Sequence, residues 1–82
     1  MGRTPAGGRQ NAVRAARQQA GLTQAALAQR ADVARQTIVA VEAGDYAPSV
    51  YLALAIASAV GASVEQLFGV DPFLEHDEPR TR

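Results

Sequence analysis

Residues 22–42 constrain the fold most, because two short helical patterns lie there on either side of a tight turn. Apolar residues recur in both patterns; they are Leu27, Ala28 and Ala31 in the first and Ile38 and Val41 in the second. This spacing of three to four positions is typical of two helices that each turn one face toward a shared core. We expect Val33 to fill the corner between them.

The boundaries of these two helices carry local signals. Thr23 is a good N-cap, because its hydroxyl can accept a hydrogen bond from an early amide of the helix. Asp32 is among the few non-glycine residues that tolerate the positive φ of a sharp turn, and Gly44 should end the second helix. The remaining residues of the unit that have no evident core role are Gln24, Gln29, Arg35, Gln36, Val39 and Ala40.

Similar signals delimit a helix on each side of this unit. Asn11 can cap a helix that runs to about residue 20, and Gly21 can end it in the left-handed conformation that glycine adopts readily. Ser49 can cap another helix that reaches about residue 60 and stops at Gly61. The expected inward stripe of that helix is Leu52, Ile56, Ala57 and Val60.

A short fifth helix should follow, because Ser63 and Gln66 have the spacing of a capping box. Its Leu67 and Phe68 are expected to close the core. The chain shows no strand pattern and no internal repeat. The sequence therefore predicts an all-α fold, a compact domain of five helices.

Length and composition fit one small domain, since the chain has 82 residues and 48% of them are hydrophobic. We expect a flexible arm over residues 1–10, the folded domain over 11–69, and an acidic tail over 70–82 that could add a dimer contact. There is no cysteine, so stability must come from helix packing or a partner subunit. The longest apolar stretch, residues 50–62, is too short to cross a bilayer, and the N-terminus lacks a signal-peptide core, which predicts a cytoplasmic protein.

The formal net charge is zero, but the charges are unevenly placed. Residues 1–31 contain arginines and no acid, whereas all eight carboxylates lie from Asp32 onward. This asymmetry suits a basic half that faces phosphates and an acidic half turned away from them. A mixed-charge surface that only maintains solubility is the alternative. All eight basic residues are arginine and alanine is abundant, which suggests a GC-rich bacterial genome.

Many positions match one known pattern in order. They are Arg14, Arg17, Gly21-Leu22-Thr23-Gln24, Leu27-Ala28, Val33-Ala34-Arg35-Gln36-Thr37-Ile38, Glu42-Ala43-Gly44, Tyr46-Ala47-Pro48-Ser49, Ala57 to Gly61, and Glu65-Gln66-Leu67-Phe68. From about Val13 to Phe68 the sequence resembles the lambda-repressor/Cro-type helix-turn-helix domain of the xenobiotic-response-element (XRE) family. The resemblance implies a lambda-repressor-like DNA-binding domain whose recognition helix, which opens at Arg35, enters the major groove.

The resemblance also implies which side chains contact double-stranded DNA. Arginine can pair with guanine O6 and N7, and glutamine with adenine N6 and N7, so Arg35 and Gln36 have the chemistry of base readers. The alternative is that both are solvated polar residues on an exposed helix end. Counting phosphate and thymine-methyl contacts, the expected DNA-binding residues are Thr23, Gln24, Arg35, Gln36, Thr37, Ala40 and Tyr46.

A structural ion pair between Arg17 and Glu42 is implied by the same resemblance, and it would tie the recognition helix to the scaffold. Loss of one partner of a partly buried pair costs ~3 kcal/mol, whereas an exposed pair contributes under about 1 kcal/mol.

Departures from the family pattern predict a modest affinity for DNA per monomer. They are Ala26, which removes a capping box, Asp32 at the turn, Ala34, which lacks a capping hydroxyl, and Asp45 in the phosphate-facing loop.

The leading interpretation is a sequence-specific transcriptional regulator, a repressor or autoregulator, that binds a palindromic operator as a homodimer. The expected dimer surface is apolar and lies beyond the fourth helix; its residues are Val64, Leu67, Val70, Phe73 and Leu74. A protein-interaction module of antitoxin type, with the tail wrapped around a basic partner, is the alternative. An enzyme, a cofactor and a metal are not expected, since the only histidine, His76, lies in a charge run of the tail.

Overall fold

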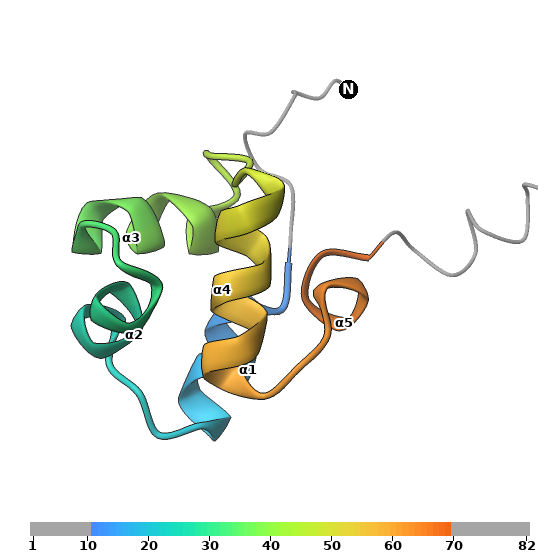
Figure 1. Ribbon diagram of the computed structural model, residues 1–82, viewed down its shortest axis with the longest axis horizontal. Coiled ribbons are helices and arrows are strands. Elements are labelled where there is room, and N and C mark those ends of the chain that lie inside the picture. Colours follow the sequence, from blue (N-terminus) through green and yellow to red (C-terminus); the bar gives the residue numbers. More distant parts are fainter. Residues whose placement is uncertain (1–10, 70–82) are drawn as a thin grey trace, which may run out of the picture.

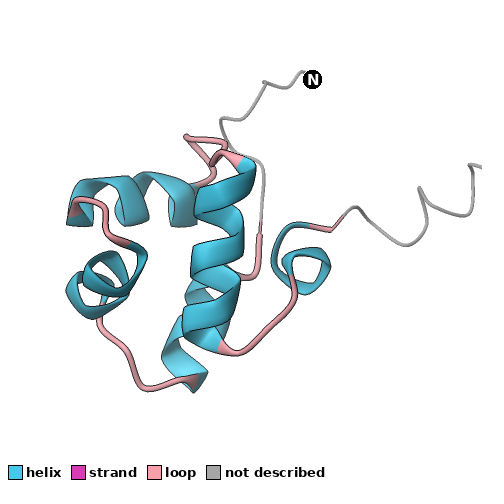
Figure 2. Cartoon of the chain, in the orientation of Figure 1, coloured by secondary structure: helices cyan, strands magenta, loops and turns pink. Residues whose placement is uncertain are grey.

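The computed structural model describes residues 11–69, and within them the chain forms five helices and no strand (Figure 1 and Figure 2). In chain order they are α1 (Val13–Gln19), α2 (Gln24–Ala31), α3 (Arg35–Ala43), α4 (Val50–Val60) and α5 (Val64–Phe68). The prediction of an all-α, five-helix fold is confirmed. The expected arm and tail lie outside the described residues.

The helices pack around α4, which crosses the middle of the domain in Figure 1. In that view α2 and α3 lie on one side of α4, α5 lies on the other, and α1 lies behind it. The contacts of α2 with α3 and with α4 are the most extensive between elements. The α2–α3 corner is therefore held by its own turn and by α4.

Every helix contributes at least one fully buried side chain to the core. The largest of these are Val13, Leu27, Ile38, Val41, Ile56 and Leu67. Burial of one such side chain contributes ~1.5–3 kcal/mol. Val33 packs against this core at the corner between α2 and α3, as the sequence predicts.

Three side-chain caps predicted from the sequence are present. The Thr23 hydroxyl accepts from the Ala26 amide at 3.0 Å, and the Ser49 hydroxyl accepts from the Leu52 amide at 3.1 Å. Ser63 and Gln66 form the complete capping box at the start of α5. These bonds satisfy amides that have no partner within their own helix, so the helix starts are fixed locally.

The turn between α2 and α3 also has the predicted conformation. Asp32 has a φ of 61°, and it is the non-glycine residue with positive φ in residues 11–69. Gly44 ends α3 with a φ of 80°. Ala34 has the extended backbone of an N-cap but makes no side-chain capping bond, so the α3 amides at this end are left without a side-chain acceptor.

Helix α1 differs from its prediction at its start. It begins at Val13, and Asn11 acts from just outside: its Oδ1 accepts from the Val13 amide at 3.0 Å. The Asn11 Nδ2 donates to the carbonyl of Val41 at 2.8 Å. The N-cap position of α1 is thus Ala12, which makes no side-chain capping bond, and Asn11 binds the first amide of α1 and joins the helix to α3.

Leu67 requires a correction, because the sequence analysis placed it on the dimer surface as well as in the core. It is only 2% exposed and belongs to the core cluster, and so it offers no surface to a second copy. Val64 is half-buried against the same core. The other three residues of the expected surface lie outside residues 11–69; they are Val70, Phe73 and Leu74.

Candidate nucleic-acid interface

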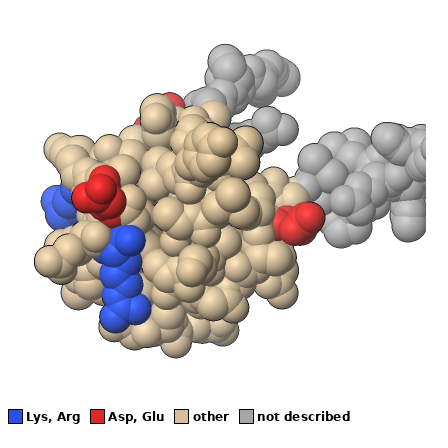
Figure 3. All heavy atoms as spheres, viewed as in Figure 1, with Lys and Arg blue, Asp and Glu red and all other residues tan. Residues whose placement is uncertain are grey.

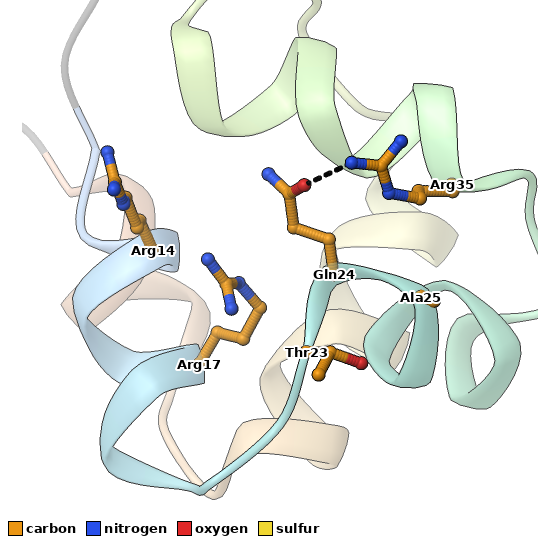
Figure 4. Close-up of a pocket in the computed structure, with 6 residues that line it drawn as sticks. All are labelled: Arg14, Arg17, Thr23, Gln24, Ala25 and Arg35. Carbon is orange, nitrogen blue, oxygen red and sulfur yellow. Dashed lines mark hydrogen bonds between the residues drawn. The ribbon is translucent and has the colours of Figure 1, made fainter.

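Four polar side chains from three helices form a continuous hydrogen-bonded chain beside the α2–α3 corner. Arg17 Nε donates to Glu42 Oε2 at 2.6 Å, and Arg17 Nη2 donates to Glu42 Oε1 at 3.3 Å. Gln24 Nε2 donates to Glu42 Oε1 at 3.1 Å. Arg35 Nη2 donates to Gln24 Oε1 at 3.2 Å (Figure 4). The chain therefore connects α1, the start of α2 and both ends of α3.

The ion pair at one end of this chain is nearly excluded from solvent. The side chains of Arg17 and Glu42 are 10% and 5% exposed. Arg17 Nη1 also donates to the carbonyl of Leu22 at 2.8 Å. A carboxylate in the last turn of a helix is disfavoured by the helix dipole, and a buried charge is costly unless it is paired. The donors from Arg17 and Gln24 offset both costs for Glu42.

Gln24 occupies a half-buried position at the first turn of α2, between Glu42 and Arg35. Its amide group is used from both sides: the NH₂ is bound by an acid, and the carbonyl oxygen by a guanidinium. This arrangement fixes the orientation of the amide, because a reversed amide would place NH₂ against Arg35. Gln24 was expected to contact a phosphate, and its bonds within the protein were not predicted from the sequence.

These residues border an open hollow of about 460 Å³, here called the arginine hollow. It is lined by Arg14, Arg17, Thr23, Gln24, Ala25 and Arg35. In Figure 4, Arg14 from α1 and Arg35 from α3 lie on either side of Gln24. Among the described residues that line it, none is acidic, and the N-terminus of α2 contributes its positive dipole end. The arginine hollow is therefore suited to an anion.

Arg14 was not among the DNA contacts predicted from the sequence, although it lines this hollow. Its position in α1, three residues before Arg17, places both arginines on neighbouring turns of one helix face. The three-residue spacing could have indicated that Arg14 lies near Arg17, but only Arg17 was given a role from the sequence.

The remaining predicted contacts are spread along α3 and its flanking loops. Gln36 is exposed at the first turn of α3, next to Arg35. Thr37 and Ala40 are half-buried on α3. Tyr46 is 47% exposed in the loop that follows α3. The structure thus gathers Thr23, Gln24 and Arg35 in the hollow, and it leaves Gln36 and Tyr46 outside it.

The described residues contain neither a metal-ligand cluster nor a membrane-spanning helix. In residues 11–69, no three histidine or acidic side chains lie close enough together to hold a metal ion. No helix in the same range has the length and apolar character needed to span a bilayer. His76 lies outside the described residues.

Helices α2 and α3 are short, pack against each other and are joined by a tight turn at Asp32. Such a pair, with exposed polar side chains at the start of the second helix, defines a helix-turn-helix domain. A family model described as helix-turn-helix matches residues 13–67. The chain therefore belongs to the XRE-type helix-turn-helix family. This is a family of DNA-binding transcription regulators, and the prediction made from the sequence resemblance is confirmed.

Similar proteins include several named as uncharacterised HTH-type transcriptional regulators. One from Methanothermobacter thermautotrophicus is 48% identical over 60 residues, which cover 72% of this chain and 87% of the relative. YgzD from Bacillus subtilis is 39% identical over 61 residues, covering 74% and 92%. One from Archaeoglobus fulgidus is 44% identical over 59 residues, covering 72% and 84%. Relatives thus occur in archaea as well as in a bacterium, and family membership is no evidence of a bacterial source.

Proposed function

We propose that this chain is a sequence-specific regulator that represses transcription by binding a palindromic operator as a homodimer. The observation that carries the proposal is the placement of Arg35. Its guanidinium is exposed at the start of α3, and Gln24 holds its Nη2 at 3.2 Å. A guanidinium held at one nitrogen keeps further N–H donors for the O6 and N7 of a guanine.

Phosphate contacts would come from the arginine hollow. Arg14 supplies a cation there, and the first turn of α2 supplies backbone amides. Tyr46, which is exposed on the loop after α3, would add a hydroxyl contact to a phosphate. Such contacts fix the register of the domain on the duplex without reading its sequence.

Gln36, Thr37 and Ala40 complete the proposed contact surface along α3. Gln36 is exposed and has the chemistry to read adenine. Thr37 suits a phosphate, and Ala40 suits a thymine methyl group. Because one recognition helix covers only a few base pairs, useful discrimination requires two copies on two half-sites. Occupancy of such a site on the chromosome in the cytoplasm would exclude other proteins from the promoter, and no catalytic step is required.

The direct test is selection of duplexes from a random pool by the full chain, followed by titration of the selected duplex and a scrambled duplex. Both titrations use one salt concentration, because phosphate contacts make affinity depend on salt. We expect two inverted half-sites spaced by about one helical turn, and tighter binding to the selected duplex by at least about 10³-fold. Equal affinity for both duplexes would contradict sequence-specific regulation and favour a protein-interaction module.

A further inference from the structure

Helix α4 has an unusual composition for a helix at the surface of a small domain. None of its eleven residues is charged, and three large apolar side chains point outward: Val50 is 70% exposed, Tyr51 83% and Leu54 52%. An outer helix face normally carries polar or charged residues, and a helix that is apolar all round is normally covered. The exposed side of α4 therefore has the character of a contact surface.

These side chains share one side of the helix. With 100° per residue, Val50, Tyr51, Leu54 and the exposed Ser58 fall within about 100° of each other around the α4 axis. We call these four residues the α4 face. In Figure 3, which shows α4 toward the viewer, the central surface is uncharged, and the coloured acidic and basic side chains lie toward the edges.

Size indicates what kind of contact this surface can support. The three large side chains expose on the order of 400 Å², which is already a sizeable patch for a monomer. A stable interface needs ~800 Å² from each partner. The α4 face alone therefore supports only a weak association with a partner. A ligand that binds both partners at once could strengthen it.

Charge decides between the candidate occupants. Residues 70–82 hold Phe73 and Leu74, but they also bring four carboxylates, for which the α4 face has no basic partner. A second copy of α4 brings only uncharged side chains. In a two-fold dimer the same surface patch of both copies forms the interface. An uncharged patch can therefore contact its own copy without bringing like charges together.

We propose that the α4 face is where two copies of this chain meet, as a weak dimer that operator DNA stabilises. The inference rests on the homodimer of the proposed function and gives that dimer a surface. It transfers the contact from α5 and the tail, where the sequence placed it, to Val50, Tyr51 and Leu54. Weak pairing through this face makes binding to two half-sites cooperative, since each bound copy raises the local concentration of the other.

The test is sedimentation equilibrium of the full chain without DNA, for the wild type and for Tyr51→Glu and Leu54→Glu. We expect wild-type self-association with a dissociation constant on the order of 100 µM, and at least a tenfold weakening in each variant. Gln29→Glu adds the same charge at an exposed position of α2, and it should leave association unchanged. Circular dichroism and the Tm check that each variant remains folded; Tyr51 is the more exposed site and carries the test if Leu54→Glu unfolds.

A variant of the tail separates the two occupants. Phe73→Glu should leave the association intact, and loss of the dimer in Phe73→Glu but not in Tyr51→Glu would overturn the proposal. A wild-type chain that stays monomeric at about 1 mM would overturn it as well. Affinity for a duplex with a single half-site should change less than about twofold in Tyr51→Glu. Failure of wild-type DNA binding itself would instead contradict the proposed function, so the two failures are distinguishable.

Discussion

Glu42 is the residue on which the position of the recognition helix depends most. It lies in the last turn of α3, and its carboxylate receives donors from Arg17 in α1 and from Gln24 in α2. Without these donors the carboxylate would be buried and unpaired, since its side chain is 5% exposed. The Glu42 carboxylate therefore links α1, α2 and α3. Gln24, whose amide is oriented by Glu42, in turn accepts a hydrogen bond from Arg35.

Glu42→Ala should lower the free energy of unfolding by ~3 kcal/mol, because Arg17 would be left as a buried charge without a partner. Urea denaturation followed by circular dichroism measures the change. Glu65→Ala is the matched control, since Glu65 is exposed on α5, and it should alter stability by no more than about 0.5 kcal/mol. An unchanged stability of Glu42→Ala, combined with a collapse of DNA affinity, would show that Glu42 faces the duplex instead.

At the scale of single elements, α3 begins without a side-chain cap although its backbone has N-cap geometry. Its N-cap residue, Ala34, has φ −71° and ψ 151° but no hydroxyl to accept from an α3 amide. The caps of α2, α4 and α5 are all made by serine or threonine side chains. The start of α3 is therefore held by the turn, by packing and by the bond from the Thr37 amide to the Ala34 carbonyl at 3.0 Å, and no side chain accepts from its first amides.

Ala34→Ser should stabilise the domain by ~0.5–2 kcal/mol, because the backbone already has N-cap geometry and the new hydroxyl can reach an early amide of α3. Thermal denaturation of the full chain measures the gain. Ala12→Ser serves as the control: Ala12 precedes α1 with ψ 14°, outside N-cap geometry, so it should give little gain. Equal stabilisation by both substitutions would argue against a capping effect.

Individual elements also show what the sequence could predict. Caps and positive-φ turns are local, and Thr23, Asp32, Ser49 and Ser63 marked their helices because each acts within three residues of itself. The bond between Arg17 and Glu42, 25 positions apart, was expected only because of the family resemblance, and the bond from Asn11 to the Val41 carbonyl was not predicted at all. A single sequence gives the period of a helix but does not show how far each helix is rotated toward its neighbours.

Because a single sequence does not show how the helices are placed relative to one another, parts of the site and of α4 were also not predicted. The family resemblance assigned Thr23, Gln24 and Arg35 to DNA contact without placing them relative to one another; in the structure all three line the arginine hollow. It did not give Arg14 a role there, because that requires knowing how α1 is placed relative to the starts of α2 and α3. The predicted inward stripe of α4 left Leu54 out of the core but did not include Ala53, which is only 7% exposed, since every residue of α4 is uncharged and no charged face orients the helix.

At the scale of the whole molecule, five short helices share one small core, so each large buried residue matters. Leu67→Ala should destabilise the domain by ~2–5 kcal/mol, because Leu67 is 2% exposed and removal of its side chain leaves a cavity. Chemical denaturation gives the value. Leu54→Ala makes the same change at a 52% exposed site, and it should cost less than about 1 kcal/mol. Equal costs would contradict the assignment of Leu67 to the core.

For the whole molecule we predict that the α2–α3 corner presents Arg35 as a reader of sequence, whereas an exposed arginine away from this corner does not discriminate between sequences. Arg30 provides the matched comparison, because it is an exposed arginine of α2 that does not line the arginine hollow. The two substitutions to alanine remove the same charge and differ in position alone.

The most direct measurement is therefore titration of Arg35→Ala, Arg30→Ala and the wild type against the selected and the scrambled duplex at one salt concentration. The account predicts that Arg35→Ala loses ~1–3 kcal/mol of discrimination between the two duplexes and keeps weak nonspecific binding. Arg30→Ala should retain the discrimination of the wild type. If Arg35→Ala weakens both duplexes equally, Arg35 contacts only the phosphate backbone and the account is contradicted.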